Sequence, residues 1–462
     1  MLIKNCLVFD HPEHTTKKGE AGTPPVAKEE ADREPIECDV RTDGDTIIEI
    51  GQNLTPFSSE TVFDGKGLWL LPGFIDIHTH LRDFGQTAKE DVASGTLSAA
   101  TGGYTTVVAM ANTVPPIDNV TTFNQLLSLI AEKAVVRVLP IATVTKGMAG
   151  KELTEMALLS ELGAVGFSDD GLPVTNLAVL RRALEQAKVL GSLVISHPED
   201  KDLSGPGSMN ESPYATIKGL AGVPTASEAA CIAREIEVVR LTRAPLHFAH
   251  VSAAASVKLI ARAKEDGLPV TADTTPHHLT LTDAEIPGYD TNFKMNPPLR
   301  SREDQEALVA ALKTGILDAI ATDHAPHTEA EKERGFAEAP CGIIGLETAF
   351  ALCLERLTEQ AVPAHRLSRR QVIDKFTTAP ARILGLPAPE IKAGAPASFS
   401  LFDPACHWTY HARKESSKSH NSPFNNRLIK GRTMLTIYAG KIAHQHEPAM
   451  NRWLAIEGLA LK

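Results

Sequence analysis

Short apolar runs alternate with longer, more polar stretches through the middle of the chain. Eight runs are rich in β-branched or small apolar residues, which is typical of buried strands. They cover residues 73–80, 104–113, 136–144, 164–170, 193–200, 245–252, 269–276 and 319–326. Between them, apolar residues recur at three- and four-residue spacing in 177–187, and segments 225–242 and 302–314 are also predicted helices. Gly191 and Gly315 stand where helix C-terminal caps belong.

Eight strand–helix alternations over about 250 residues predict a TIM (β/α)8 barrel of the α/β class. In that fold, chemistry gathers at the carboxyl ends of the strands. A doubly wound open sheet is the alternative, but no G-x-G-x-x-G pattern follows any of the predicted strands.

The two ends of the chain differ from the middle. Residues 1–70 and 394–462 both have strand character, so we expect them to build one small β domain beside a barrel spanning 71–393. The segment 11–35 is rich in proline, glycine and charge and is predicted to be a mobile surface insert. A second polar tract, 411–426, separates the two C-terminal strand regions.

Composition narrows the classes of function. The chain has 462 residues and a formal charge of −11, which argues against a nucleic-acid or anionic membrane surface as partner. No run reaches the roughly 18 apolar residues of a membrane span, and the N-terminus lacks signal-peptide architecture. The six cysteines form no CxxC pair, which favours a cytoplasmic enzyme with free thiols.

Polar residues close several of the apolar runs. His78 and His80 are two positions apart at the end of the first run, so on a strand they project to the same side. Other runs end in His197, His250 and Asp323, and the fourth ends in Asp169 and Asp170. Imidazole and carboxylate groups are ligands for Zn²⁺ and similar ions. Because these groups exceed the needs of one tetrahedral ion, the pattern predicts two metal ions bridged by a carboxylate and a hydroxide.

Five motifs resemble the amidohydrolase superfamily, and within it the bacterial long-chain (type I) dihydroorotases. The motifs are GFIDIHTHLRDFG, GFSDDG, TPHHL, NFKMNPPLR and IATDHAPHT. The resemblance implies that His78 and His80 bind one metal and that His197 and His250 bind the other. It also implies that Asp170 bridges the two ions and that Asp323 is both a ligand and the general base. One departure is Phe84, where many relatives carry proline.

The residue that bridges the two metal ions differs between enzyme groups of this superfamily. Hydantoinases, allantoinases and many dihydroorotases bridge their metals with a carboxylated lysine on the fourth strand, whereas AVGFSDDG contains no lysine. A direct aspartate bridge favours a dihydroorotase over a hydantoinase. We expect Asp169 to support the site or the turn before Gly171, without binding metal itself.

A second set of residues is predicted to bind substrate. The guanidinium of Arg82 matches a carboxylate, and the amide of Asn112 can donate to the same group. The resemblance assigns carboxylate binding to Arg82, Asn112 and His327, and ring contacts to Asn296. It also assigns ring contacts to backbone groups around Cys341 and Gly342.

The resemblance implies a zinc-dependent dihydroorotase with two ions per subunit. The reaction would be the reversible hydrolysis of L-dihydroorotate to N-carbamoyl-L-aspartate in pyrimidine biosynthesis. Another cyclic amidohydrolase, such as an allantoinase or hydantoinase, stays open. So does a catalytically silent scaffold for aspartate transcarbamoylase, although such homologues lose ligands that this chain retains. We expect a homodimer, with association with aspartate transcarbamoylase undecided.

Overall fold

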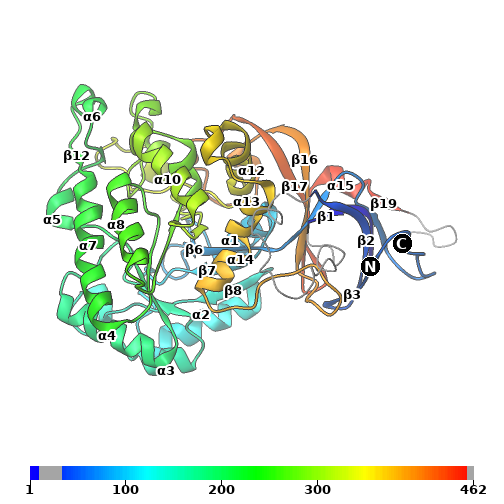
Figure 1. Cartoon of the computed structure of the whole chain (residues 1–462), viewed down its shortest axis with the longest axis horizontal. Helices are drawn as coiled ribbons and strands as arrows, with labels where there is room; N and C mark the ends of the chain where they lie inside the picture. The colour runs from blue at the N-terminus through cyan, green and yellow to red at the C-terminus, as the bar shows by residue number, and fades with distance from the viewer. Residues whose placement is uncertain (10–33, 455–462) are drawn as a thin grey trace, which may run out of the picture.

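The structure, a computed structural model, describes residues 1–9 and 34–454. Figure 1 shows two bodies, a barrel surrounded by helices and a twisted sheet that contains both ends of the chain. The expected insert at 11–35 lies almost entirely outside the described residues.

All eight predicted strands are present, and they run parallel to one another. They are β6 (Phe74–Thr79), β7 (Tyr104–Ala109), β8 (Arg137–Pro140), β9 (Gly166–Phe167), β10 (Leu193–Ser196), β13 (Leu246–Phe248), β14 (Val270–Thr274) and β15 (Ala319–Ile320). Three of them pair in the order β6-β7-β8 and five in the order β9-β10-β13-β14-β15. Parallel bridges from Ala142 to Phe167 and from Thr79 to His324 join the two groups. The closed circuit of eight parallel strands confirms the TIM barrel.

Helices cover the outside of the barrel (Figure 1). The longer ones are α1 (Val92–Gly102), α2 (Val120–Lys133), α4 (Leu177–Leu190), α7 (Thr225–Thr242), α8 (Ala254–Glu265) and α10 (Arg302–Thr314). The predicted bounds of α7 and α10 are confirmed. Local chemistry fixes the ends: Asn176 caps α4 by accepting from the N–H of Ala178, and Gly191 ends that helix in the left-handed region at φ 64°.

Shorter elements fill the connections. They are α3 (Met156–Glu161), α5 (Lys201–Ser204), β11 (Met209–Asn210), α6 (Pro213–Lys218), β12 (Gly222–Val223), α9 (Pro276–Thr280), α11 (Glu329–Lys332), α12 (Ala349–Glu355), α13 (Arg369–Phe376), α14 (Thr378–Ile383) and α15 (Glu447–Met450).

The two chain ends share one nine-stranded sheet. Its strands are β1 (Leu2–Val8), β2 (Ile36–Asp43), β3 (Thr46–Gly51), β4 (Val62–Asp64), β5 (Trp69–Pro72), β16 (Phe399–Thr409), β17 (Leu428–Tyr438), β18 (Lys441–Gln445) and β19 (Trp453–Leu454). The main order is β18-β17-β16-β5-β1-β2-β3, so C-terminal β16 pairs directly with N-terminal β5. The sheet has its own apolar core, which includes Phe63, Phe399 and Leu435. The domain boundaries at 70/71 and 393/394 stay a prediction.

The β16–β17 connection, residues 410–427, leaves the sheet and lies against the barrel. Ser417 Oγ donates to buried Glu90, and the N–H of Ser416 donates to Glu347 at 2.9 Å. From the sequence, this tract is predicted only as a polar spacer between strands.

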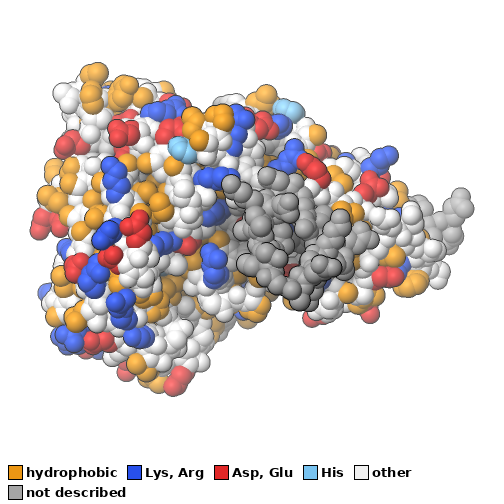
Figure 2. Space-filling model, viewed as in Figure 1, with side chains coloured by type: hydrophobic (Ala, Val, Ile, Leu, Met, Phe, Trp, Pro, Cys, Tyr) orange, Lys and Arg blue, Asp and Glu red, His pale blue; other side chains and the backbone are white. Residues whose placement is uncertain are grey.

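None of the described helices is long and apolar enough to cross a membrane. On the face shown in Figure 2, acidic and basic side chains are interspersed.

Candidate active site

The six proposed metal ligands lie together at the carboxyl ends of the barrel strands. His78 lies in β6 and His80 just beyond it, and the others follow β9, β10, β13 and β15. Each is at most 6% exposed. Polar side chains are rarely buried this deeply unless they are paired or bind a cation, so the cluster indicates a site rather than a core.

Asp170 occupies the centre of this cluster. Its Oδ1 lies 3.4 Å from His78 Nε2, 3.5 Å from His197 Nδ1 and 3.8 Å from His250 Nε2, and its Oδ2 lies 3.5 Å from His80 Nε2. Two compact ligand groups result, His78–His80–Asp170 and Asp170–His197–His250, and they share the aspartate. A carboxylate shared in this way has the arrangement that a binuclear metal site requires.

The contacts of Asp170 fit a shared metal ligand better than they fit hydrogen bonds, although His197 Nδ1 and His250 Nε2 lie 2.9 Å apart, at hydrogen-bond distance. Both ring nitrogens of His78 are buried and have no hydrogen-bond partner among the described residues. The 3.4–3.5 Å gaps from Asp170 to His78, His80 and His197 are long for hydrogen bonds. Two tetrahedral ligands about 2.05 Å from one ion would be roughly 3.3 Å apart, close to these gaps.

Asp323, which follows β15, adds a second carboxylate to the group His78–His80–Asp170. Its Oδ1 lies 3.2 Å from His80 Nε2 and 3.5 Å from His78 Nε2. Burial raises the pKa of Asp323, but the neighbouring histidines His80 and His78 outweigh it and lower the pKa below its usual range. The carboxylate is therefore ionised at neutral pH, as a ligand or a proton acceptor must be.

The buried carboxylates also raise the pKa values of two of the histidines, His78 and His197. Burial lowers the pKa of His78, but Asp170 and Asp323 outweigh it and raise the pKa to about 10. His197 shows the same balance and a pKa raised to about 9, with Asp170 and Glu199 as the opposing carboxylates. The carboxylates thus favour positive charge at these two imidazoles, so the site is electrostatically suited to a cation.

Glu199 is a supporting residue that the sequence analysis missed. His197 Nε2 donates to Glu199 Oε2 at 3.0 Å, so its Nδ1 faces Asp170. The same oxygen accepts from Asn296 Nδ2 at 2.9 Å and from Lys201 Nζ at 2.5 Å. A signal was available, because Glu199 follows His197 by two positions and so can project to the same side of an extended chain.

Two aspartates hold the backbone around the ligands. Asp169 accepts from the N–H groups of Val144 and Thr145 at 2.8 and 3.0 Å and belongs to neither compact ligand group, which agrees with its expected supporting role. Asp76, fully buried, accepts from the N–H of Thr322 at 3.0 Å and so ties β6 to β15 beneath the site.

The predicted carboxylate-binding residues lie beside the metal ligands. Arg82 is 8% exposed, and its Nη2 donates to His327 Nε2 at 3.3 Å. Burial, followed by the charges of Arg82 and Lys89, lowers the pKa of His327 to about 3, so its imidazole is neutral. Asn112 instead bridges two ligands, accepting from His80 Nδ1 at 3.0 Å and donating to Asp170 Oδ2 at 2.9 Å.

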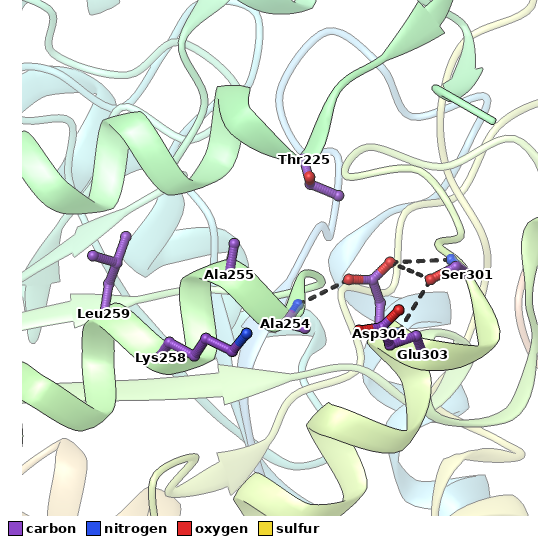
Figure 3. A pocket seen from close by; sticks show the side chains of 8 residues that line it. All are labelled: Thr225, Ala254, Ala255, Lys258, Leu259, Ser301, Glu303 and Asp304. Carbon is purple, nitrogen blue, oxygen red and sulfur yellow. Dashed lines mark hydrogen bonds between the residues drawn. The ribbon is translucent and has the colours of Figure 1, made fainter.

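A pocket of about 260 Å³ contains both sets of residues. Its lining includes Arg82, Asn112, Asn296, His327, Cys341 and Gly342, together with five of the six proposed ligands, all except His78. The N–H of Gly342 donates to Lys294 O and its carbonyl accepts from Lys332 Nζ, so both groups already have partners. A wider surface groove of about 580 Å³ lies between the N-terminal ends of α7, α8 and α10 and contains none of these residues (Figure 3).

Other histidines occupy supporting positions. His247 is buried between Thr271 and Asp273, as expected of a structural strand residue. His324 is turned toward Glu90 and the N–H of Gly345, away from the ligand cluster. His278 bonds to Thr275 and the carbonyl of Pro297, whereas His277 Nε2 is buried and unpaired among the described residues.

The barrel, the attached sheet and the two carboxylate-linked histidine groups define a hydrolase of the amidohydrolase class. A family model described as "Dihydro-orotase-like" matches residues 67–256. The dihydroorotase of Geobacter sp. (strain M21) is 46% identical over 399 residues, which are 86% of this chain and 93% of that protein. The dihydroorotase of Endomicrobium trichonymphae is 46% identical over 407 residues, covering 87% and 95%. The chain belongs to the dihydroorotase family, whose members are cyclic amide hydrolases.

Solved structures agree on the fold. The dihydropyrimidinase from Brevibacillus agri NCHU1002 superposes with a TM-score of 0.78 at 25% identity, over 96% of this chain and 95% of that one. The L-hydantoinase (dihydropyrimidinase) from Arthrobacter aurescens gives 0.80 at 22% identity, over 96% of both chains. The barrel and the sheet built from both chain ends are thus shared with solved structures of a dihydropyrimidinase and a hydantoinase.

Proposed function

We propose that this chain catalyses the reversible hydrolysis of L-dihydroorotate to N-carbamoyl-L-aspartate at a binuclear zinc site. The observation that carries the proposal is one pocket of about 260 Å³ lined by Arg82, His327 and the metal-ligand cluster. A cation beside a metal cluster suits a cyclic amide that also bears a carboxylate. A hydantoin without that carboxylate would leave Arg82 buried and unpaired by substrate.

The residues would perform three tasks: holding the metal ions, transferring a proton and orienting the substrate. His78, His80, His197, His250, Asp170 and Asp323 would hold two Zn²⁺ ions, with Asp170 between them. When bound, the ions would lower the pKa of a water to make it a nucleophile and would polarise the amide carbonyl. Asp323 would take the proton of that water and pass it to the departing ring nitrogen, and would return it during ring closure.

Arg82 and His327 would orient the substrate by its carboxylate. Arg82 remains charged, since burial lowers its pKa only to about 10. Asn296, fixed by Glu199, would contact the ring, as would backbone groups near Cys341. Asn112 would both steady His80 and face the substrate.

Steady-state hydrolysis of four substrates tests the proposal. We expect kcat/KM for L-dihydroorotate to exceed that for dihydrouracil, hydantoin and allantoin by at least about a hundredfold, because only it offers a carboxylate to Arg82. Faster hydrolysis of hydantoin or allantoin would instead support another cyclic amidohydrolase. A protein that binds two ions but turns over none of them would support a silent scaffold.

A further inference from the structure

Asn421 lies in the β16–β17 connection and is buried between two loops of the barrel, with 3% of its surface exposed. Its Nδ2 donates to the carbonyl oxygens of Ala325 at 2.9 Å and Gly342 at 3.0 Å. Its Oδ1 accepts from the N–H of His327 at 3.0 Å, and its carbonyl accepts from the N–H of Ile344 at 3.1 Å. One side chain thus pairs with backbone groups of two loops that both line the proposed substrate pocket.

The two loops are in direct contact at Gly342. A Cβ there would lie 2.5 Å from the carbonyl oxygen of Ala325 and 2.7 Å from His327 Cδ2, closer than side chains approach. Gly342 also has a φ of 156°, which favours glycine. Because the backbone at 342 packs on the imidazole of His327, a shift of either loop would displace that imidazole.

The β16–β17 connection is itself fastened to the barrel at independent points. Buried Glu90 accepts from Ser417 Oγ, and Glu347 accepts from the N–H of Ser417 at 3.1 Å. Ser419 Oγ donates to the carbonyl of Lys89 at 2.6 Å. These anchors hold Asn421 in place independently of its own contacts with the loops, so it can serve as a rigid support.

We propose that Asn421 is a positioning residue for substrate binding, which fixes His327 against the loop at 341–342. The inference rests on the proposed function, in which His327 and Arg82 receive the substrate carboxylate. Asn421 bonds to the two loops and to none of the six proposed metal ligands. It should therefore govern substrate affinity and leave the metal centre intact.

Kinetics of the full-length, zinc-loaded protein test this role. Asn421→Ala is expected to raise KM for L-dihydroorotate about tenfold, to leave kcat within about threefold, and to leave metal content unchanged. If Asn421 acts through His327, the double variant with His327→Ala should be no worse than His327→Ala alone. Additive losses, a loss of metal or a collapse of kcat would mean a merely structural role and would overturn the proposal.

Two further variants make the outcome decisive. Asn425→Ala is the matched control, since Asn425 is an exposed asparagine of the same connection that accepts from the N–H of Ala412, and its KM should not change. Asn421→Asp keeps the shape but cannot donate to Ala325 and Gly342, so it should also raise KM and serves if the alanine variant does not fold. Normal KM in both Asn421 variants beside a raised KM in His327→Ala overturns the positioning role alone. An unchanged KM in His327→Ala overturns the carboxylate assignment of the proposed function.

Discussion

Glu199 Oε2 lies 3.0 Å from His197 Nε2, while the other ring nitrogen of His197, Nδ1, faces Asp170. The carboxylate thereby fixes the tautomer and the orientation of this imidazole. Glu199→Gln should weaken binding of one of the two ions about 10- to 100-fold, measured by competition with a chelator. Glu237→Gln, on the exposed face of α7, is the control. Equal affinities in the two variants would show that Glu199 does not orient a ligand.

The shared carboxylate makes a prediction about metal stoichiometry. Asp170→Ala should lower the occupancy of both ions, because both ligand groups contain this residue. Asp169→Ala should lower it less, since its side chain holds the backbone of Val144 and Thr145. Elemental analysis after reconstitution measures both. Equal losses would mean that the wrong carboxylate has been assigned as the bridge.

Replacement of Asp323 tests the proposed mechanism most directly. Asp323→Asn keeps an oxygen ligand and removes the base, so we expect retained metal and a loss of roughly a hundredfold or more in kcat in both directions. The lowered pKa of Asp323 leaves it ionised at neutral pH; hydrolysis should weaken as pH falls toward that pKa and ring closure should strengthen. Near-normal turnover at full metal occupancy would exclude Asp323 as the base.

Arg82 should determine specificity. Arg82→Met removes a charge-assisted pair, which should cost on the order of 2–4 kcal/mol in transition-state binding of dihydroorotate. Metal content should stay normal, and the slow hydrolysis of uncharged dihydrouracil should change little. Comparison of kcat/KM for the two substrates provides the measurement. A variant equally impaired on both would place Arg82 in a structural role.

Glu347 should make the stability of the folded protein depend on pH. Burial, reinforced by the charge of Glu415, raises its pKa to about 7, although Ser98, Ser416 and Ser417 donate to it. The folded state therefore keeps a proton that the unfolded state, with a pKa near 4.5, has lost, so stability is gained as pH falls through 7. Raising the pH from 6 to 8 should cost on the order of 1 kcal/mol through this group. Thermal unfolding of Glu347→Gln should lack this part of the pH dependence; an unchanged profile would contradict the raised pKa.

Much of the barrel could be predicted from sequence because its signals are local. The buried strands are apolar runs, and the polar residue that ends each run lies at the carboxyl end of a strand, whichever neighbour the strand pairs with. His78, His80, His197, His250 and Asp323 were found in this way. So was the pair Asp169–Asp170, even though β9 contains only two residues, and the family resemblance then selected Asp170. Glu199 was within reach of the same reasoning, since two positions on an extended chain return a side chain to the same side.

Sequence by itself thus determined the alternation of strands and helices, the residue types at the strand ends and the likeness to a family. Only the tertiary structure decided which groups meet: His80 and Asp323 are 243 positions apart, and Asn421 and His327 are 94 apart. The tract 411–426 is mostly polar, and its few apolar residues, such as Ala412 and Phe424, form no periodic pattern that could tell whether it would cover the sheet or the barrel. Its place depends on hydrogen bonds to buried carboxylates such as Glu90, and such partners are brought together only when the barrel closes.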